Sequence, residues 1–339
     1  MSAANSKKVV IAALSGNLAI AVCKFTAAFL SGSTATLAEA VHSLADSGNQ
    51  LLLLIGIGLA IRPASEKFPF GRAAERYFWP FVVALMLFSV GGAFAIIEGI
   101  VHLLHGGGGS PAGEVLQFSV FGHAVSFRAS YLNYGVLGTS FLFEALSFRV
   151  AFREFKVLSK GQPLRKALLE ARDPTIPLVL AEDSTALVGL GIALAAVVLS
   201  GATGNEWWDP LGSLIIGILL CFVAVVLARV THGLLIGESA TIEDQAHVLR
   251  VVEQVDGVDR VTQLLTMHLG PDEIVLALKI AFRPDIKLRE LEETTNLIEA
   301  KLRAVMPQMR KIFIEPDSKG DGRGLKSARA LSEIDEASL

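Results

Sequence analysis

The stretch PLGSLIIGILLCFVAVVLARVTHGLLI at residues 210–236 decides the fold class of this chain. It is predominantly apolar and longer than the roughly 20 residues that a helix needs to cross the hydrocarbon core of a bilayer. Unpaired backbone groups are costly in lipid, so such a run is expected to be helical. Five more runs of this kind predict six transmembrane helices in all, at residues 9–30, 37–61, 78–104, 130–152, 176–200 and 210–236.

The composition agrees with a membrane protein. Of the 339 residues, 52% are hydrophobic and only 19% are charged, and the mean hydropathy is +0.53. Soluble domains carry about 25% charged residues. The net charge of -3 gives no reason to expect a nucleic-acid partner. Cys23 and Cys221 lie inside apolar runs, so we expect two buried core residues rather than a disulfide or a metal-binding pair.

Basic residues predict the orientation, because they are enriched in cytoplasmic loops. Residues 31–36 and 201–209 contain no Lys or Arg, and 105–129 contains only Arg128, which marks these connections as external. Both termini are therefore predicted to be cytoplasmic, with residues 1–8 as a short tail. The first run is too long for a signal-peptide core, and a bacterial inner membrane is the expected location. The basic residues of the cytoplasmic side are Lys7, Lys8, Arg62, Lys67, Arg72, Arg76, Arg153, Lys156, Lys160, Arg165, Lys166 and Arg172.

The composition changes at Ser239, where a soluble domain is predicted to follow the membrane domain of residues 9–238. Helical periodicity marks 243–254 and 288–305. Alternating apolar positions mark strands at 257–269 and 273–283, around a Gly270–Pro271 turn, and a last strand at 310–315. The order αββαβ predicts a ferredoxin-like α+β domain over 239–316, with a sheet small enough to favour pairing with a second copy. The polar tail, 317–339, is predicted to be disordered.

The second apolar run contains AEAVHSLADSGNQ at residues 38–50. His42 and Asp46 are four residues apart, which places them on one face of a helix. Imidazole nitrogen and carboxylate oxygen are suitable ligands for zinc and similar cations. A hydrogen bond between the two side chains, with a purely structural role, is the alternative. Glu39 lies nearer the external end and is a candidate for the helix entry.

The fifth run contains two adjacent acids, Glu182 and Asp183. Neighbouring side chains on a helix point about 100° apart, so both cannot project fully toward one point. Two unpaired acids in lipid would be very unfavourable, which implies a cation or a proton. If the span began later, both acids would instead lie at the membrane interface.

Three more polar residues interrupt the apolar runs: Asn17 and Lys24 in the first and Glu144 in the fourth. We assign them structural or gating roles. Lys24 could extend to the interface or pair with an acid, and Glu144 is a candidate partner.

These motifs resemble the cation diffusion facilitator family over residues 8–315, closest to its zinc transporter 9 branch. The similar stretches are AEAVHSLADSGNQ, FPFGRAAERY at 68–77, ARDPTIPLVLAEDSTALVG at 171–189 and WDPLGSLIIGILL at 208–220. The resemblance implies a homodimer in the lipid bilayer that exports a divalent metal from the cytoplasm in exchange for protons. Zinc is the first expectation. Metal and protons would be substrates, and no cofactor is expected.

The resemblance also implies a transport site with two residues from the second span and two from the fifth, four apart in each. Here these are His42 and Asp46, then Asp183 with Val179 four residues before it. Valine cannot ligate a metal, so Glu182 is the substitute candidate. The group that replaces the missing fourth ligand affects which metal the site prefers.

Two secondary metal sites of the family are not expected here. In the loop after the second span, Phe68 and Arg72 stand where many members have histidines. In the soluble domain, His247 and His268 are not at the matching positions, although Glu315 and Asp317 fall where some members have His-x-Asp.

Three other interpretations remain open. The oxygen-rich ligand set also suits manganese or iron, and cobalt accepts the same ligand types. A membrane scaffold without transport would fit the missing ligand at position 179. An intramembrane metalloenzyme would need a motif such as HExxH, which does not occur, so the protein is not expected to be an enzyme.

Overall fold

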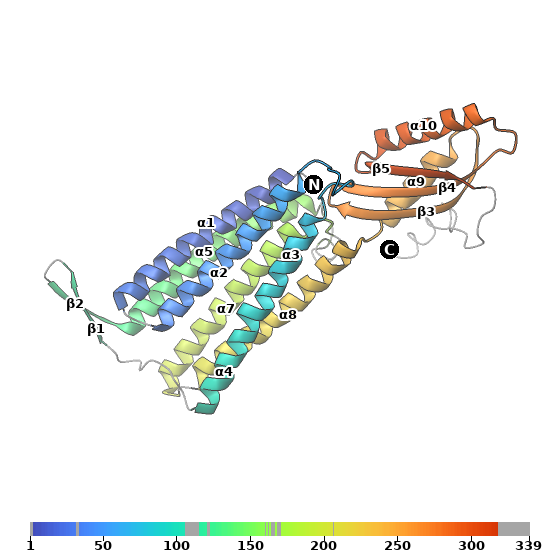
Figure 1. The fold of residues 1–339 in the computed structure, drawn as a ribbon. Coiled ribbons are helices and arrows are strands. Elements are labelled where there is room, and N and C mark those ends of the chain that lie inside the picture. The colour runs from blue at the N-terminus through green and yellow to red at the C-terminus, as the bar shows by residue number, and fades with distance from the viewer. Residues whose placement is uncertain are drawn as a thin grey trace. The chain divides into compact units, whose positions relative to one another are not determined.

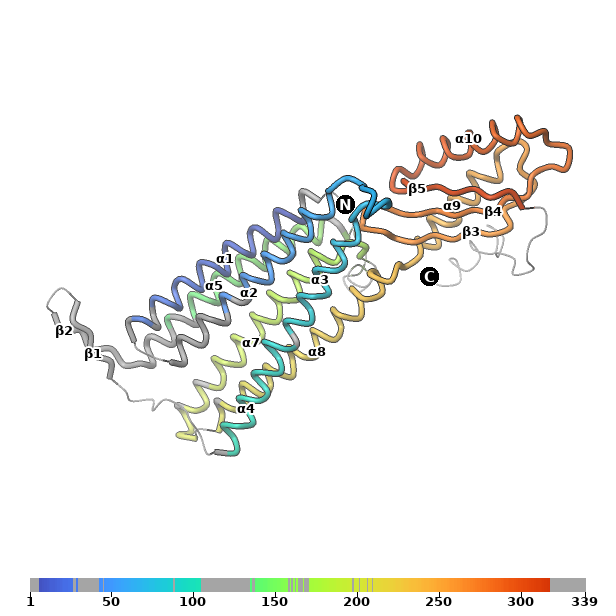
Figure 2. Tube along the Cα trace, in the orientation of Figure 1, coloured from blue at the N-terminus to red at the C-terminus, as the bar shows by residue number. Residues whose placement is uncertain are grey.

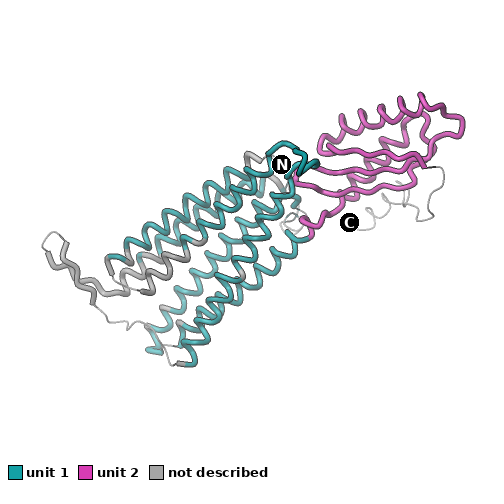
Figure 3. The backbone as a smooth tube through the Cα atoms, in the orientation of Figure 1, with its two compact units in different colours: residues 1–232 teal, residues 233–339 magenta. Residues whose placement is uncertain are grey.

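The structure is a computed structural model that describes residues 3–31, 34–105, 115–120, 123–159, 161, 163, 167, 171–205 and 207–317. The chain divides into two compact units, Met1–His232 and Gly233–Leu339, which Figure 3 shows in different colours. Apart from Asp317, the predicted disordered tail lies outside the described residues.

Long helices occupy all six predicted spans (Figure 1). The helix of the first span begins at Ala3, so the polar residues before Val9 continue the helix. The third span is one continuous rod made of three segments. In chain order the helices are α1 (Ala3–Ser31), α2 (Thr34–Ala60), α3 (Glu75–Met86), η1 (Leu87–Ala93), α4 (Phe94–His105), α5 (Ala129–Leu158), α7 (Thr175–Thr203) and α8 (Trp208–Ile236).

The helices of the first unit lie side by side as a bundle. Helix α1 packs against α2, α5 and α7, α5 packs against α7, and α3 packs against α2 (Figure 2). Helix α8 approaches the third span closely, because a Cβ at Gly217 would lie 2.9 Å from the carbonyl oxygen of Gly92. Small residues at such contacts let two backbones approach, as is common between helices in membranes.

The bundle is apolar outside and polar inside. Large apolar side chains such as Leu18, Val22, Phe94 and Phe222 are exposed on its surface. The buried set contains many polar residues, which in a water-soluble protein would favour the surface. This inversion is expected when the surrounding solvent is lipid. Among the described side chains, the buried polar residues of the bundle helices are Ser6, Asn17, Lys24, Ser43, Ser47, Asn49, Gln50, Arg76, Ser140, Glu144, Ser147, Thr175, Glu182, Asp183, Thr185 and Thr231.

Length and composition identify four stretches in the described part of the chain that could cross a membrane: Ser6–Thr26, Glu75–Leu104, Thr175–Ser200 and Pro210–Ile236. The other two segments, α2 and α5, are 27 and 30 residues long. The structure therefore confirms the predicted class, a helical membrane domain followed by a small α+β domain.

The third span contains a π-helix, η1, of seven residues between α3 and α4. It includes the pair Gly91–Gly92, and Gly92 faces Cys221 of α8. A π-helix has i→i+5 hydrogen bonds and occurs mostly as a short insertion in an α-helix. The apolar periodicity did not indicate this irregularity.

Two expectations for this unit need correction. The connection between the third and fourth spans, for which we predicted no secondary structure, contains an antiparallel pair of strands, β1 (Val115–Val120) and β2 (His123–Arg128). The alternating apolar and polar residues of VLQFSV and HAVSFR explain the pairing. The prediction that Cys23 is buried is wrong, because this residue is exposed on α1. Cys221 is half-buried, and both cysteines are free thiols.

The second unit has the predicted αββαβ order. It consists of α9 (Ile242–Glu253), β3 (Val258–Gly270), β4 (Glu273–Phe282), α10 (Leu288–Val305) and β5 (Lys311–Pro316). The strand order is β3-β4-β5, with β3 antiparallel and β5 parallel to the central β4. Helix α9 begins at a side-chain cap, because the Thr241 hydroxyl accepts a hydrogen bond from the Asp244 N–H at 3.1 Å.

The core of this unit lies between the two helices and one face of the sheet. Alternate residues of β4 are buried, among them Leu276, Leu278 and Ile280. They share an apolar cluster with Leu249 of α9 and Leu302 of α10. A core of its own makes this unit a separate domain.

Candidate functional site

The candidate site is built mainly on α7. Before it, Asp173 Oδ1 accepts a hydrogen bond from the Thr175 N–H at 3.1 Å, which satisfies a free donor of the first turn. Residues 173–180 are all buried, so the helix enters the bundle at once. Seven and eight residues after Thr175 come Glu182 and Asp183, which are 8% and 1% exposed. Both acids thus lie inside the bundle, and not on its surface.

The two adjacent acids point to different helices, as the helical rotation between neighbours requires. Glu182 faces α2, where Asn49 Nδ2 donates to its Oε1 and Gln50 Nε2 donates to its Oε2, both at 3.1 Å. Asp183 faces α5, where Ser147 Oγ donates to its Oδ2 at 2.7 Å. Each carboxylate is therefore held in place by a neighbouring helix.

The acids of three helices interact electrostatically inside the bundle. Asp46 of α2 acts on both Glu182 and Asp183. Glu144 of α5 is 8% exposed and is acted on by all three of these acids. Glu144, Glu182 and Asp183 are buried and Asp46 is half-buried, and mutual repulsion of their charged forms favours uptake of cations or protons.

Asn17 and Lys24, the predicted polar residues of α1, are also buried, at 3% and 6% exposure. The Lys24 ammonium acts electrostatically on Glu144 and partly offsets the effect of the acids. Pairing of Lys24 with Glu144 stays a prediction.

The structure leaves part of the predicted ligand set undescribed. The backbone of His42 belongs to α2, but its side chain lies outside what the structure describes. Val179 is fully buried and offers no ligand atom. Among the described side chains, no three His, Cys, Asp or Glu residues form a group that could hold a metal ion. His42, Asp46, Asp183 and Glu182 therefore stay a predicted ligand set.

Sequence reasoning missed three residues that contact the acids. Asn49 and Gln50 are three and four residues after Asp46, and Ser147 is three residues after Glu144. In each case the spacing places the polar residue one helical turn from an acid. That spacing on an otherwise apolar helix was the signal that could have identified them.

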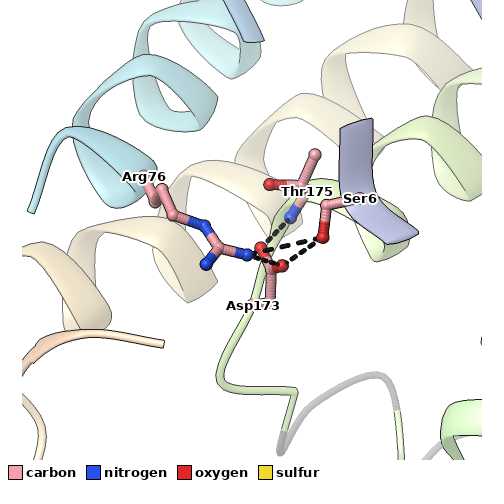
Figure 4. A network of polar contacts seen from close by, with 4 residues as sticks. All are labelled: Ser6, Arg76, Asp173 and Thr175. Carbon is pink, nitrogen blue, oxygen red and sulfur yellow. Dashed lines mark hydrogen bonds and ion pairs between the residues drawn. The ribbon is translucent and has the colours of Figure 1, made fainter. Parts of the chain in front are cut away.

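A second polar cluster, also missed, joins the beginnings of three helical segments (Figure 4). Arg76 of α3 forms an ion pair with Asp173, and the two side chains are 5% and 0% exposed. The Ser6 hydroxyl of α1 donates to the same carboxylate at 2.6 Å. With the bond to Thr175, this one aspartate connects α1, α3 and α7.

Comparisons with known proteins identify the family. A model of the cation efflux transmembrane domain matches residues 10–236, and a model of the cation efflux protein cytoplasmic domain matches residues 241–319. The chain belongs to the cation efflux family. Its two structural units correspond to the two domains that these family models describe, and the resemblance noted from the motifs is confirmed.

Several named proteins resemble the chain. Metal tolerance protein C4 of Arabidopsis thaliana is 29% identical over 94% of this chain and 64% of its own length. The mitochondrial proton-coupled zinc antiporter of Homo sapiens is 28% identical over 81% of this chain and 46% of its own length. A manganese efflux system protein of Bacillus subtilis is 21% identical over 91% of this chain and 95% of its own length. The chain thus spans about two thirds of the length of the Arabidopsis thaliana relative and about half of the length of the Homo sapiens relative.

Proposed function

We propose that the protein exports a divalent metal cation from the cytoplasm in exchange for protons, with zinc as the first candidate. The carrying observation is the group of four acids from α2, α5 and α7, of which Glu144, Glu182 and Asp183 are buried in the bundle. Buried carboxylates at this density need bound cations or protons. The relative named as a proton-coupled zinc antiporter supports both substrates.

In this proposal the cation is bound by His42, Asp46 and Asp183, with Glu182 as the fourth ligand. Metal ligands must be deprotonated, so binding a cation releases protons. When the site opens to the other side, external protons compete with the cation for the same groups. His42 is the proposed proton carrier, since imidazole changes its charge close to neutral pH. Ser147 would keep the Asp183 carboxylate oriented.

The proposed arrangement in the membrane follows from the loops. The basic residues after the second and fourth spans place these connections and both termini in the cytoplasm, with an inner membrane as the proposed location. Residues 9–238 form the proposed transport domain and 239–316 the proposed cytoplasmic dimerisation domain of a homodimer. A family model for the cytoplasmic domain matches this second part.

Manganese is the second candidate substrate, because the described site is rich in oxygen atoms. Glu182, Asp183 and Asp46 contribute carboxylates, and the family position four residues before Asp183 holds valine. Carboxylate and carbonyl oxygens suit manganese better than they suit zinc. The relative named as a manganese efflux system protein supports this second candidate.

The test is transport into proteoliposomes with an imposed pH gradient, with zinc, manganese, iron(II) and cobalt measured in parallel. Zinc uptake that collapses with the gradient and in Asp46→Ala would support the antiporter. Asp259→Ala is the matched control, because it removes an exposed acid of the second unit. No uptake of any metal by folded, dimeric protein would contradict the proposal and favour a scaffold.

A further inference from the structure

Two amide side chains of α2, Asn49 and Gln50, surround the carboxylate of Glu182. They are 4% and 0% exposed. Their nitrogens donate to the two oxygens of Glu182, one bond to each. The carboxylate therefore has neutral donors on both oxygens, where a bound cation would otherwise compensate its charge.

Among the described residues, the other ends of these amides have no hydrogen-bond partner. Asn49 Oδ1 and Gln50 Oε1 are fully buried and accept no hydrogen bond among the described residues. A buried acceptor without a donor costs free energy, so each such atom in a folded protein needs an explanation. Two such acceptors, on the two amides that bind one carboxylate, are an independent indication of a missing ligand.

The position of this group on the helices gives it a direction. Asn49 and Gln50 follow Asp46 by three and four residues, so they lie about 5–6 Å further along α2. They lie toward the end of α2 that leads into the basic loop at 62–74, which is the predicted cytoplasmic side. Glu182 precedes Asp183 on α7, which runs in from the same side.

We propose that Asn49 and Gln50 form an oxygen-only station for a divalent cation with Glu182, which this station shares with the transport site, on the cytoplasmic side of His42, Asp46 and Asp183. The proposal rests on the transport function above and adds a determinant of specificity. Without a cation, the two amides donate to Glu182. When a cation binds to the carboxylate, rotation of each amide by about 180° presents its carbonyl oxygen as a ligand.

The chemistry predicts which cations the station favours. Its atoms are carboxylate and amide oxygens, which suit manganese, whereas imidazole suits zinc. Loss of the amides should therefore weaken the handling of manganese more than that of zinc, which keeps the predicted imidazole of His42.

The experiment compares Mn(II) and Zn(II) with full-length protein, by equilibrium binding in detergent and by transport in proteoliposomes. Asn49→Leu and Gln50→Leu remove one amide each. We expect the Kd and KM for Mn(II) to rise by about tenfold or more, with a much smaller rise for Zn(II). Ser47→Ala is the matched control, because within the described part of the chain the hydroxyl of this buried serine donates only to the Ser43 carbonyl of its own helix.

A double variant, Gln50→Glu with Glu182→Gln, exchanges the amide and the carboxylate. It keeps the composition of the station and one hydrogen bond across it, so we expect Mn(II) binding close to that of the parent. This variant also decides the question if the leucine variants do not fold.

Three outcomes would overturn the station. The Kd and KM could change equally for Mn(II) and Zn(II), or both leucine variants could keep the constants of the parent. The exchange variant could also fold without binding Mn(II). The two proposals fail separately. If the parent binds Mn(II) through Asn49 but transports no metal, the transport function fails and the station stands. If the parent transports and Asn49→Leu has the Mn(II) and Zn(II) constants of the parent, only the station fails.

Discussion

Arg76 and Asp173 form a buried ion pair that connects the first turn of α3 to the entrance of α7. They are 97 residues apart in the sequence. The aspartate also accepts hydrogen bonds from the Ser6 hydroxyl and from the Thr175 backbone N–H. Its negative charge therefore interacts with one cation and two hydrogen-bond donors. Removing one partner of such a pair leaves an uncompensated charge in a site closed to water.

Breaking this pair should therefore destabilise the folded bundle strongly. We expect Arg76→Met or Asp173→Leu alone to cost about 3–5 kcal/mol of unfolding free energy. The double variant should be less destabilised than either single variant, because no lone charge remains. Denaturant unfolding in detergent measures this as a double-mutant cycle. Additive losses would show that the two residues act independently.

Ser147 should tune metal affinity through Asp183. Ser147→Ala removes the 2.7 Å hydrogen bond to Asp183 Oδ2 and frees the carboxylate to rotate. Loss of such a supporting contact typically weakens metal binding by about 10–100-fold, so we expect a rise of about tenfold in KM. Ser140→Ala is the control, since Ser140 is a buried serine of the same helix whose hydroxyl has no partner among the described residues. Equal effects of the two variants would argue against the supporting role.

Val179 offers a direct test of metal preference. Val179→His would place an imidazole four residues before Asp183, where the family has its ligand, and should raise the ratio of zinc to manganese transport by about tenfold. The valine is fully buried, so the larger side chain should also cost about 1–3 kcal/mol of stability. Val179→Leu adds volume without a ligand atom and separates the two effects. A histidine variant with the ratio of Val179→Leu would contradict a ligand role at this position.

The close contact between the third span and α8 should leave no room for a side chain at Gly92 or Gly217. A Cβ at Gly92 would lie 2.5 Å from Cys221 Sγ, and one at Gly217 would lie 2.8 Å from the backbone nitrogen of Ile96. We expect either alanine variant to lose about 1–3 kcal/mol, measured as a lower thermal midpoint. Gly58→Ala and Gly191→Ala provide controls, because a Cβ there meets no other atom within 4 Å. Their midpoints should equal or exceed that of the parent, since alanine favours helix.

Elements with a clear periodicity could be predicted closely from the sequence. The predicted strand at 273–283 corresponds to β4, Glu273–Phe282, because its alternate apolar residues face a single core. The predicted helix at 288–305 corresponds to α10 for the same kind of reason. The hairpin at β1 and β2 was missed because short alternating segments beside glycines give a weak signal.

The site was predicted only where a charge stood out against an apolar background. Glu182 and Asp183 were identified in this way, and burial of both agrees with that expectation. Asn49 and Gln50 carry no charge, so they were not predicted as site residues. The partners Arg76 and Asp173 were assigned to loops, and their pairing depends on how α1, α3 and α7 pack, which local patterns do not contain.

The π-helical segment Leu87–Ala93 has a consequence for the lengths that this span could have had during evolution. Each i→i+5 hydrogen bond encloses one residue more than the i→i+4 bond of an α-helix. A deletion of one residue here would restore α-helical bonding, and the residues on both sides would keep their faces toward α2 and α8. In an ordinary α-helix the same deletion rotates everything after it by about 100°. The span thus holds one spare residue at the place where it contacts α8, and a homologous sequence shorter by one position would be expected to align with its gap at this segment.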